Sequence, residues 1–147
     1  MEQPIDATLH AIWEANRLLR DEGERMAASA GQTHARRMVL QTAGSGATVP
    51  DIARRLSLQR QSIQRVADQL VEEGLACYQA NPRHRRSKLL LTTPAGNEVL
   101  HSLAAIHDDW IREIGKLTPS MPWDEMRRGL ETLVDALKTK SPEIQNE

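Results

Sequence analysis

Apolar residues recur every three or four positions along most of the chain, the spacing that predicts amphipathic helices. The first such helix is expected over about residues 5–28 and the second over about residues 33–42. The run Gly44-Ser45-Gly46 then interrupts the pattern, because closely spaced glycines favour turns over helices. We therefore expect the first third of the chain to be two helices followed by a break.

Two further helices, joined by a tight turn, are expected in the middle of the chain. Thr48 can cap the first of them, and Pro50 fits its first turn, where the missing N–H would have no helical partner. Ser57-Leu58 forms the turn, and the second helix extends over about residues 59–73 until a glycine ends it. Its expected buried face consists of Ile63, Val66, Ala67, Leu70 and Val71.

Two short strands follow, over about residues 75–80 and 88–92, and residues 81–87 join them as a hairpin loop. Thr93-Pro94 begins a long helix, and a last helix follows a break marked by two prolines. The expected fold is mainly α with a small β-hairpin wing, in which a winged helix-turn-helix core carries a further layer of helices.

Composition supports a soluble helical protein. The chain has 147 residues, of which 39% are hydrophobic, but only 3% are aromatic and none is Phe. A hydrophobic core with so few aromatic residues favours helices over a β-sandwich. Because no apolar run approaches the roughly 20 residues of a membrane span and the N-terminus lacks a signal-peptide pattern, we expect a cytoplasmic protein without membrane contact. The single Cys77 excludes an internal disulfide framework.

The charge is distributed unevenly. The formal net charge is −1, yet the segment from Asp51 to Lys88 holds eight basic and four acidic residues. A basic segment within an acidic chain can meet a polyanion locally. Arginines that merely face solvent on helix surfaces would give the same count. Only the positions of these arginines can distinguish a nucleic-acid-binding surface from such ordinary exposed residues.

The helix expected over residues 59–73 places polar side chains opposite its apolar face. The second helix of a helix-turn-helix enters the major groove of DNA, where Arg can pair with guanine and Gln with adenine. Ser62 suits a phosphate contact near the helix start. The candidate DNA-contacting residues on this helix are Arg60, Gln61, Ser62, Gln64 and Arg65.

The hairpin loop adds a second cationic element. Arg83, His84, Arg85 and Arg86 crowd its tip, and like charges so close repel unless an anion offsets them. An arginine on such a wing can enter the narrow minor groove. We therefore expect Arg83, Arg85 and Arg86 to contact DNA as well.

The stretch TVPDIARRLSLQRQSIQRVADQLVEEGLACYQANPRHRRSKLLLTTPAG resembles the core of the MarR family along nearly its whole length. The matching motifs are I-A-x-x-L in the first helix, R-Q-S-I-Q-R-V-A-D-Q-L and E-E-G-L in the second, N-P-x-x-R-R-S in the wing and T-P-A-G before the next helix. The resemblance implies a homodimer, a palindromic operator and often a small-molecule or oxidant signal, with Arg86 as the minor-groove arginine.

Four positions depart from the family pattern. His84 stands where the family usually has Asp, which puts the rigidity of the wing in question, and Ser57 stands where it often has Gly. Gln59 is a weak cap in place of Ser or Thr. Thr92 replaces a frequent Leu and is expected to loosen the second strand.

Apolar residues of the outer helices are expected to form a dimer seam, since one helix-turn-helix recognises few base pairs and symmetric pairs are the commonest oligomers. An intramolecular core is the alternative. The seam residues are Ile5, Leu9, Ile12, Trp110, Ile114, Leu130, Leu133 and Leu137. The chain is thus divided into an N-terminal dimerisation helix (1–30), a winged helix-turn-helix DNA-binding core (31–95) and C-terminal dimerisation helices (96–147).

An effector site is expected in a cleft between the two layers, where Trp13, His34, Arg36 and Trp110 are candidate contacts, although a structural or surface role is the more frequent one for such residues. Cys77 is a candidate oxidant sensor, with an inert buried thiol as the more frequent alternative. The five histidines show no paired metal spacing, so we expect no metal site and no cofactor.

The sequence therefore predicts a sequence-specific, double-stranded DNA-binding transcriptional regulator, a repressor that acts as a homodimer on a palindromic operator and is released by a small-molecule or oxidant signal. No G-x-S-x-G elbow, phosphate-binding glycine loop or H-E-x-x-H pair is present, so we do not expect an enzyme. The alternatives are a winged-helix module that binds protein and a regulator insensitive to ligands.

Overall fold

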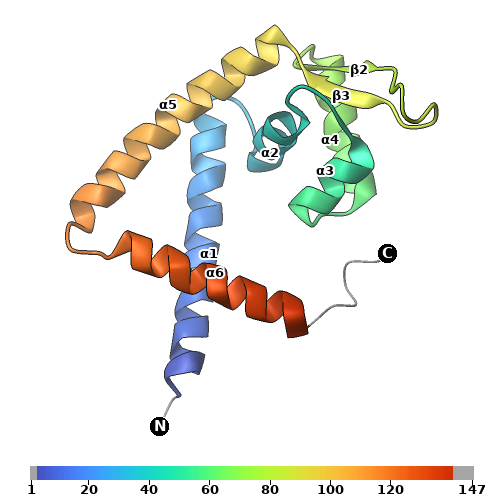
Figure 1. The fold of residues 1–147 in the computed structure, drawn as a ribbon. Coiled ribbons are helices and arrows are strands. Elements are labelled where there is room, and N and C mark those ends of the chain that lie inside the picture. The colour runs from blue at the N-terminus through green and yellow to red at the C-terminus, as the bar shows by residue number, and fades with distance from the viewer. Residues whose placement is uncertain (1–2, 141–147) are drawn as a thin grey trace. The chain divides into compact units, whose positions relative to one another are not determined.

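The computed structural model describes residues 3–140, and it confirms the mainly helical fold with a small wing. The chain divides into two compact units, one ending at Asp109 and the other beginning at Trp110. The elements in chain order are α1 (Pro4–Ser29), α2 (His34–Ala43), β1 (Ala47–Thr48), α3 (Val49–Leu56), α4 (Arg60–Glu72), β2 (Ala76–Gln79), β3 (Leu89–Thr92), α5 (Pro94–Leu117) and α6 (Trp123–Lys140). Figure 1 shows α2, α3 and α4 beside the strands of the first unit.

The sheet differs from the predicted two-stranded hairpin. It has three strands in the order β1-β3-β2, all antiparallel, and β1 pairs Ala47 with Leu90 and Thr48 with Leu89. A strand of two residues is too short for apolar and polar positions to alternate visibly, so the sequence pattern could not reveal it. The central strand β3 is consequently paired on both edges.

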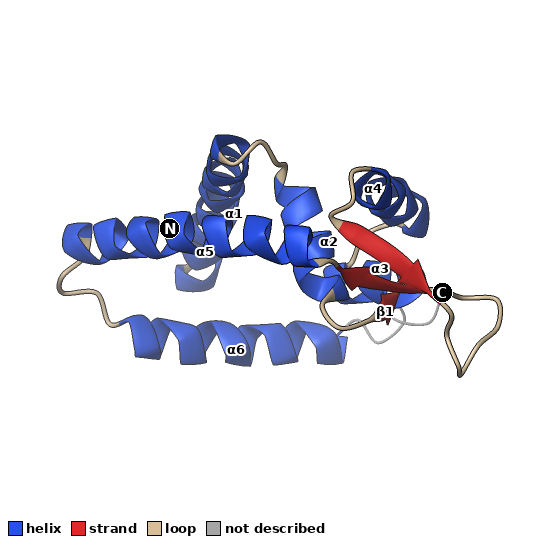
Figure 2. Cartoon of the chain, turned by 90° about the horizontal axis from the view of Figure 1, so that it is seen from above, coloured by secondary structure: helices blue, strands red, loops and turns tan. Residues whose placement is uncertain are grey.

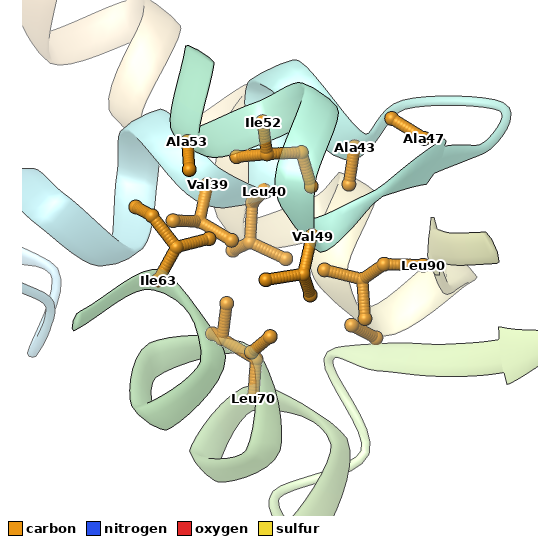
Figure 3. Packing of buried hydrophobic residues seen from close by; sticks show 12 residues of the cluster. Val39, Leu40, Ala43, Ala47, Val49, Ile52, Ala53, Ile63, Leu70 and Leu90 are labelled. Carbon is orange, nitrogen blue, oxygen red and sulfur yellow. The ribbon is translucent and has the colours of Figure 1, made fainter. Parts of the chain in front are cut away.

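The core of the first unit forms where the apolar faces of α2, α3 and α4 meet β3. Leu40, Ile52, Ile63, Leu70 and Leu90 are fully buried there, and Figure 3 shows these side chains pointing toward one another. Burying one side chain of this size contributes roughly 1.5–3 kcal/mol. The predicted inner face of α4 is confirmed by Ile63, Ala67 and Leu70, while Val66 and Val71 are partly buried at its edge.

Polar side chains fix the ends of the helices as the sequence predicts. The Thr48 hydroxyl accepts a hydrogen bond from the Asp51 N–H at 3.2 Å, and the Thr93 hydroxyl accepts one from the Gly96 N–H at 3.2 Å. Thr92 does not loosen its strand: its hydroxyl donates to the Leu40 carbonyl at 2.7 Å. The polar residue therefore ties β3 to α2, which corrects our expectation.

The long outer helices leave many apolar side chains exposed within a single chain. Ile5 and Trp13 on α1, Leu117 at the end of α5 and Leu137 on α6 are among them. No helix of the described residues is both long enough and apolar enough to span a membrane.

Gly96 allows α5 to begin directly against the chain segment that joins α4 to β2. A Cβ at this position would lie 2.1 Å from the backbone carbonyl oxygen of Leu75 and 2.7 Å from the Thr92 Cγ2. The Leu75 carbonyl itself accepts a hydrogen bond from the Thr93 N–H at 3.1 Å and cannot move away freely.

We expect Gly96→Ala to lower the free energy of unfolding by at least about 2 kcal/mol, because overpacking against backbone forces the helix to shift. The matched control is Gly74→Ala, where φ is +75° but nothing lies within 4 Å of the added Cβ. That control should cost only about 1 kcal/mol of backbone strain. Urea unfolding measures both, and equal losses would contradict the close approach.

Candidate nucleic-acid interface

A left-handed residue makes the turn that joins α3 to α4. Ser57 has φ 54° and ψ 43°, the conformation that Gly adopts most easily. The Leu58 N–H donates to the Ala53 carbonyl at 2.9 Å and closes the end of α3. The turn directs α4 across α3, with Ile52 and Ile63 buried between them.

The side of α4 opposite this core faces solvent. Gln59 precedes the helix without a side-chain capping bond, as its weak capping ability predicts. The N–H groups of the first turn therefore lack a side-chain partner from the N-cap residue. The five predicted DNA-contacting residues of this helix, which are Arg60, Gln61, Ser62, Gln64 and Arg65, are all exposed.

The loop of residues 80–88 between β2 and β3 forms the wing tip. Asn81 shapes it: its side-chain oxygen accepts from the Arg83 N–H at 3.0 Å, and its carbonyl accepts from the His84 N–H at 3.3 Å. Figure 2 shows this loop extending away from α2, α3 and α4. The three arginines at the tip, Arg83, Arg85 and Arg86, and His84 between them are all exposed.

The arginines of α4 and the wing have no carboxylate partner among residues 3–140. Elsewhere in the chain Arg17, Arg25, Arg36, Arg54 and Arg127 each form an ion pair with Asp or Glu. Arg20, Arg37, Arg55 and Arg128 also have no ion pair in the described range, but they lie on four different helices. The unneutralised guanidinium groups are therefore most closely spaced on α4 and the wing, and such a concentration favours contact with a polyanion.

A three-membered hydrogen-bond cluster connects α4 to the wing. The Gln64 amide nitrogen donates to the Asp68 carboxylate at 3.0 Å and to the Tyr78 hydroxyl at 2.9 Å, and that hydroxyl donates to Asp68 at 2.7 Å. Burial, with the neighbouring Asp68 carboxylate, raises the pKa of Tyr78 to about 12. Sequence analysis missed this cluster, since nothing in the pattern places Tyr78 of β2 beside α4.

Arg36, one of the predicted effector contacts, is engaged within the chain. Its guanidinium forms a two-pronged ion pair with Glu73, one contact measuring 3.0 Å, and its Nε donates to the Gln32 side chain at 2.8 Å. The hydrogen bond from Arg36 holds the pKa of the Glu73 carboxyl below its usual value. This ion pair ties α2 to the C-terminal end of α4.

The other predicted effector contacts are dispersed. Trp13 is exposed on α1, with the His10 ring against its edge at a centroid distance of 5.4 Å. His34 lies at the start of α2, against Gly23 of α1, and its Nδ1 is buried without a hydrogen bond from the described residues. Trp110 belongs to the second compact unit.

The predicted dimer residues are incompletely buried within one chain. Ile5, Leu130 and Leu137 are 73%, 42% and 53% exposed, and the remaining five are partly buried. An open apolar hollow runs along α6 and is lined by Trp123, Met126, Leu130 and Val134, with charged residues at its margins. None of the four predicted effector contacts lines it.

No group of three or more His, Cys, Asp or Glu side chains in the described range is placed to hold a metal ion. Cys77 of β2 is a free, partly buried thiol.

The comparison with known proteins agrees with this architecture. Residues 34–87, from α2 to the wing tip, match the model of the MarR family. An uncharacterized protein of Mycobacterium tuberculosis is 36% identical over 143 residues, covering 97% of this chain and 100% of its own length. A protein of Mycobacterium bovis matches equally well.

Solved structures share the fold at lower sequence identity. CouR of Rhodococcus jostii, bound to p-coumaroyl-CoA, superposes with a TM-score of 0.73 at 19% identity and covers 100% of both chains. The transcriptional regulator MOSR of Mycobacterium tuberculosis, in complex with DNA, reaches 0.65 at 21% identity, covering 89% of this chain and 96% of its own. With its winged helix-turn-helix, its matched core and its full-length relatives, the chain belongs to the MarR family of transcriptional regulators.

Proposed function

We propose that the protein is a repressor that binds double-stranded DNA in a sequence-specific manner, as a homodimer on a palindromic operator. One observation carries the proposal: the exposed, unneutralised guanidinium groups of α4 and of the wing belong to the one winged helix-turn-helix unit. The DNA-bound relative MOSR supports it. A regulator of chromosomal genes would work in the cytoplasm, where we place the protein.

The first half of α4 supplies the major-groove contacts. Arg65 and Arg60 can pair bidentately with guanine, and Gln61 can pair with adenine. Ser62 and the first-turn N–H groups of α4 suit a phosphate, because a helix start favours anions. These contacts combine affinity for the backbone with recognition of bases.

The wing supplies a second contact on the flank of the same site. Arg86 would enter the minor groove, while Arg83 and Arg85 would meet backbone phosphates. The Asn81 turn holds the loop in shape without the Asp that the family usually has at position 84. The wing can therefore be ordered even though His84 provides no carboxylate to hold an arginine.

A homodimer would place two such units on successive turns of DNA, about 34–36 Å apart. The exposed apolar side chains of α1, α5 and α6 need a partner, since large apolar patches on soluble proteins mark interaction surfaces. A second copy is the partner that also explains a palindromic site.

A small molecule would release the repressor only if it binds one arrangement of the dimer better than the other. CouR binds p-coumaroyl-CoA, which supports an effector for this chain too. Trp13, His34, Arg36 and Trp110 remain our candidate contacts. Because Arg36 is paired with Glu73 beside the end of α4, an anion that competed for Arg36 would disturb the helix that contacts DNA.

We expect Arg65→Ala and Arg86→Ala each to weaken binding to the DNA upstream of the chain's own gene. Loss of a base-pairing arginine costs about 1–3 kcal/mol, and loss of a phosphate contact reduces the slope of log K against log salt by about one. Gel shifts across a salt series measure both quantities. Arg25→Ala on α1, which removes an arginine paired with Glu22, is the matched control.

If both variants bound as tightly as the wild type, α4 and the wing would not be the contact surface. Absence of any DNA binding, together with capture of a protein partner, would favour the alternative of a protein-interaction module.

We expect the wild type to be a dimer at micromolar concentration and the double variant Leu130→Glu/Leu137→Glu to be a monomer, because burying two carboxylates in an apolar seam is strongly unfavourable. Size-exclusion chromatography with light scattering gives the mass. Thr132→Glu, two residues after Leu130 and on another side of α6, is the control and should remain a dimer. A monomeric wild type would contradict the proposed assembly.

A further inference from the structure

Gln64 lies in the first half of α4, which the proposed function assigns to the major groove, and it forms a hydrogen-bond cluster with Asp68 and Tyr78. Gln64 and Asp68 are one helical turn apart on α4, and Tyr78 comes from β2 (Figure 1). Gln64 and Asp68 are exposed, and Tyr78 is partly buried. The cluster therefore connects a solvent-facing amide with the wing strand.

The chemistry of the partners settles which way the amide is turned. A carboxylate only accepts hydrogen bonds, so the amide atom at 3.0 Å from Asp68 must be the nitrogen. The Tyr78 hydroxyl donates its only hydrogen to Asp68, so toward Gln64 it can only accept. The Tyr78 hydroxyl hydrogen has its acceptor in Asp68, and the amide cannot flip without placing its oxygen against the carboxylate.

The spacing of the two acceptors leaves part of the amide unused. The Asp68 and Tyr78 oxygens are 2.7 Å apart, so both lie on the same side of the Gln64 nitrogen. The two N–H bonds of an amide diverge widely, and one of them serves this side. The carbonyl oxygen and the second N–H are left for an outside partner.

We propose that Tyr78 and Asp68 are positioning residues that hold the Gln64 amide with its oxygen and one N–H presented to an adenine in the major groove. This inference rests on the proposed DNA-binding function. An amide with one acceptor and one donor matches the N6 donor and N7 acceptor of adenine. A Gln side chain that rotates freely loses conformational entropy when it binds DNA. The cluster already restricts the rotamers of Gln64 in the unbound protein, so less entropy is lost on binding.

The cluster also limits the effect of the negative charge at this surface. Asp68 on α4 would repel DNA phosphates, and one of its oxygens accepts hydrogen bonds from Gln64 and Tyr78, which disperse part of its negative charge. The charged groups nearest along the same helix face are Arg65 and Glu72, both exposed. Through its hydrogen bond to Gln64, Tyr78 links the wing strand to the orientation of that amide.

The test is selection of bound sequences from a random duplex pool by the wild type, Gln64→Ala and Tyr78→Phe, with Gln69→Ala on the same helix as the control. We expect the wild type and the control to enrich adenine at one position of each half-site. Gln64→Ala should lose that preference by about tenfold or more. Tyr78→Phe should reduce it about three- to tenfold while the preferences at other positions and the affinity for random DNA stay unchanged.

A Tyr78→Phe variant that keeps the full adenine preference would overturn this inference alone. A wild type that enriches no sequence would overturn the proposed function and this inference together. If Tyr78→Phe lost its preference at all positions, Tyr78 would have a structural role in holding α4 against β2. That result would also contradict the positioning role proposed for Tyr78.

A second readout needs no DNA, because Tyr78 is the only tyrosine of the chain. With a pKa of about 12 in the folded state, it should remain un-ionised at pH values where a free phenol, with a pKa of about 10, has lost its proton. The stability that this shift contributes is present below pH ~10 and is lost as the pH rises toward 12.

Absorbance of tyrosinate, followed while the circular dichroism shows folded protein, measures this pKa. Asp68→Asn should lower the pKa, since it removes the charge that opposes ionisation. A wild-type pKa near 10 in the folded protein, or no change in Asp68→Asn, would show that the cluster does not form.

Discussion

Burial of one face of α4 is the constraint on which the rest of the structure depends. Ile63, Ala67 and Leu70 occupy that face, and all three are inaccessible to solvent. When one face of a helix is buried, the helical period fixes which residues lie on the opposite face and point to solvent. The core of the first unit, made with Leu40 and Leu90, thereby determines that the arginines and glutamines of α4 face outward.

The parts of this structure that could be predicted are those that depend on local spacing. Residues 59–73 were expected as a helix, and α4 covers Arg60–Glu72, because its apolar residues recur with helical period. Capping by Thr48 and Thr93 followed from side chains next to the helices they begin. The basic wing tip could be predicted because its arginines are close together in the sequence, within one hairpin loop.

The parts that could not be predicted depend on contacts between residues distant in the sequence. Arg36 is predicted as a candidate effector contact, but Glu73, far along the chain, forms an ion pair with it. Gln64 is predicted to contact DNA, and nothing in the local pattern indicates that Tyr78 of a different element binds its amide. The short strand β1 exists because β3 offers an unpaired edge, which no pattern within Ala47–Thr48 encodes.

The central claim is that the outer face of α4 lies in the major groove while the wing lies on the flank of the same site. Directed hydroxyl-radical cleavage tests it most directly, with an iron chelate on Gln61→Cys, His84→Cys or Thr132→Cys in a Cys77→Ser background. The account predicts cleavage within each half-site from position 61, cleavage of the flanking base pairs from position 84, and none from position 132. Cleavage from position 132 alone, or from neither 61 nor 84, would contradict it.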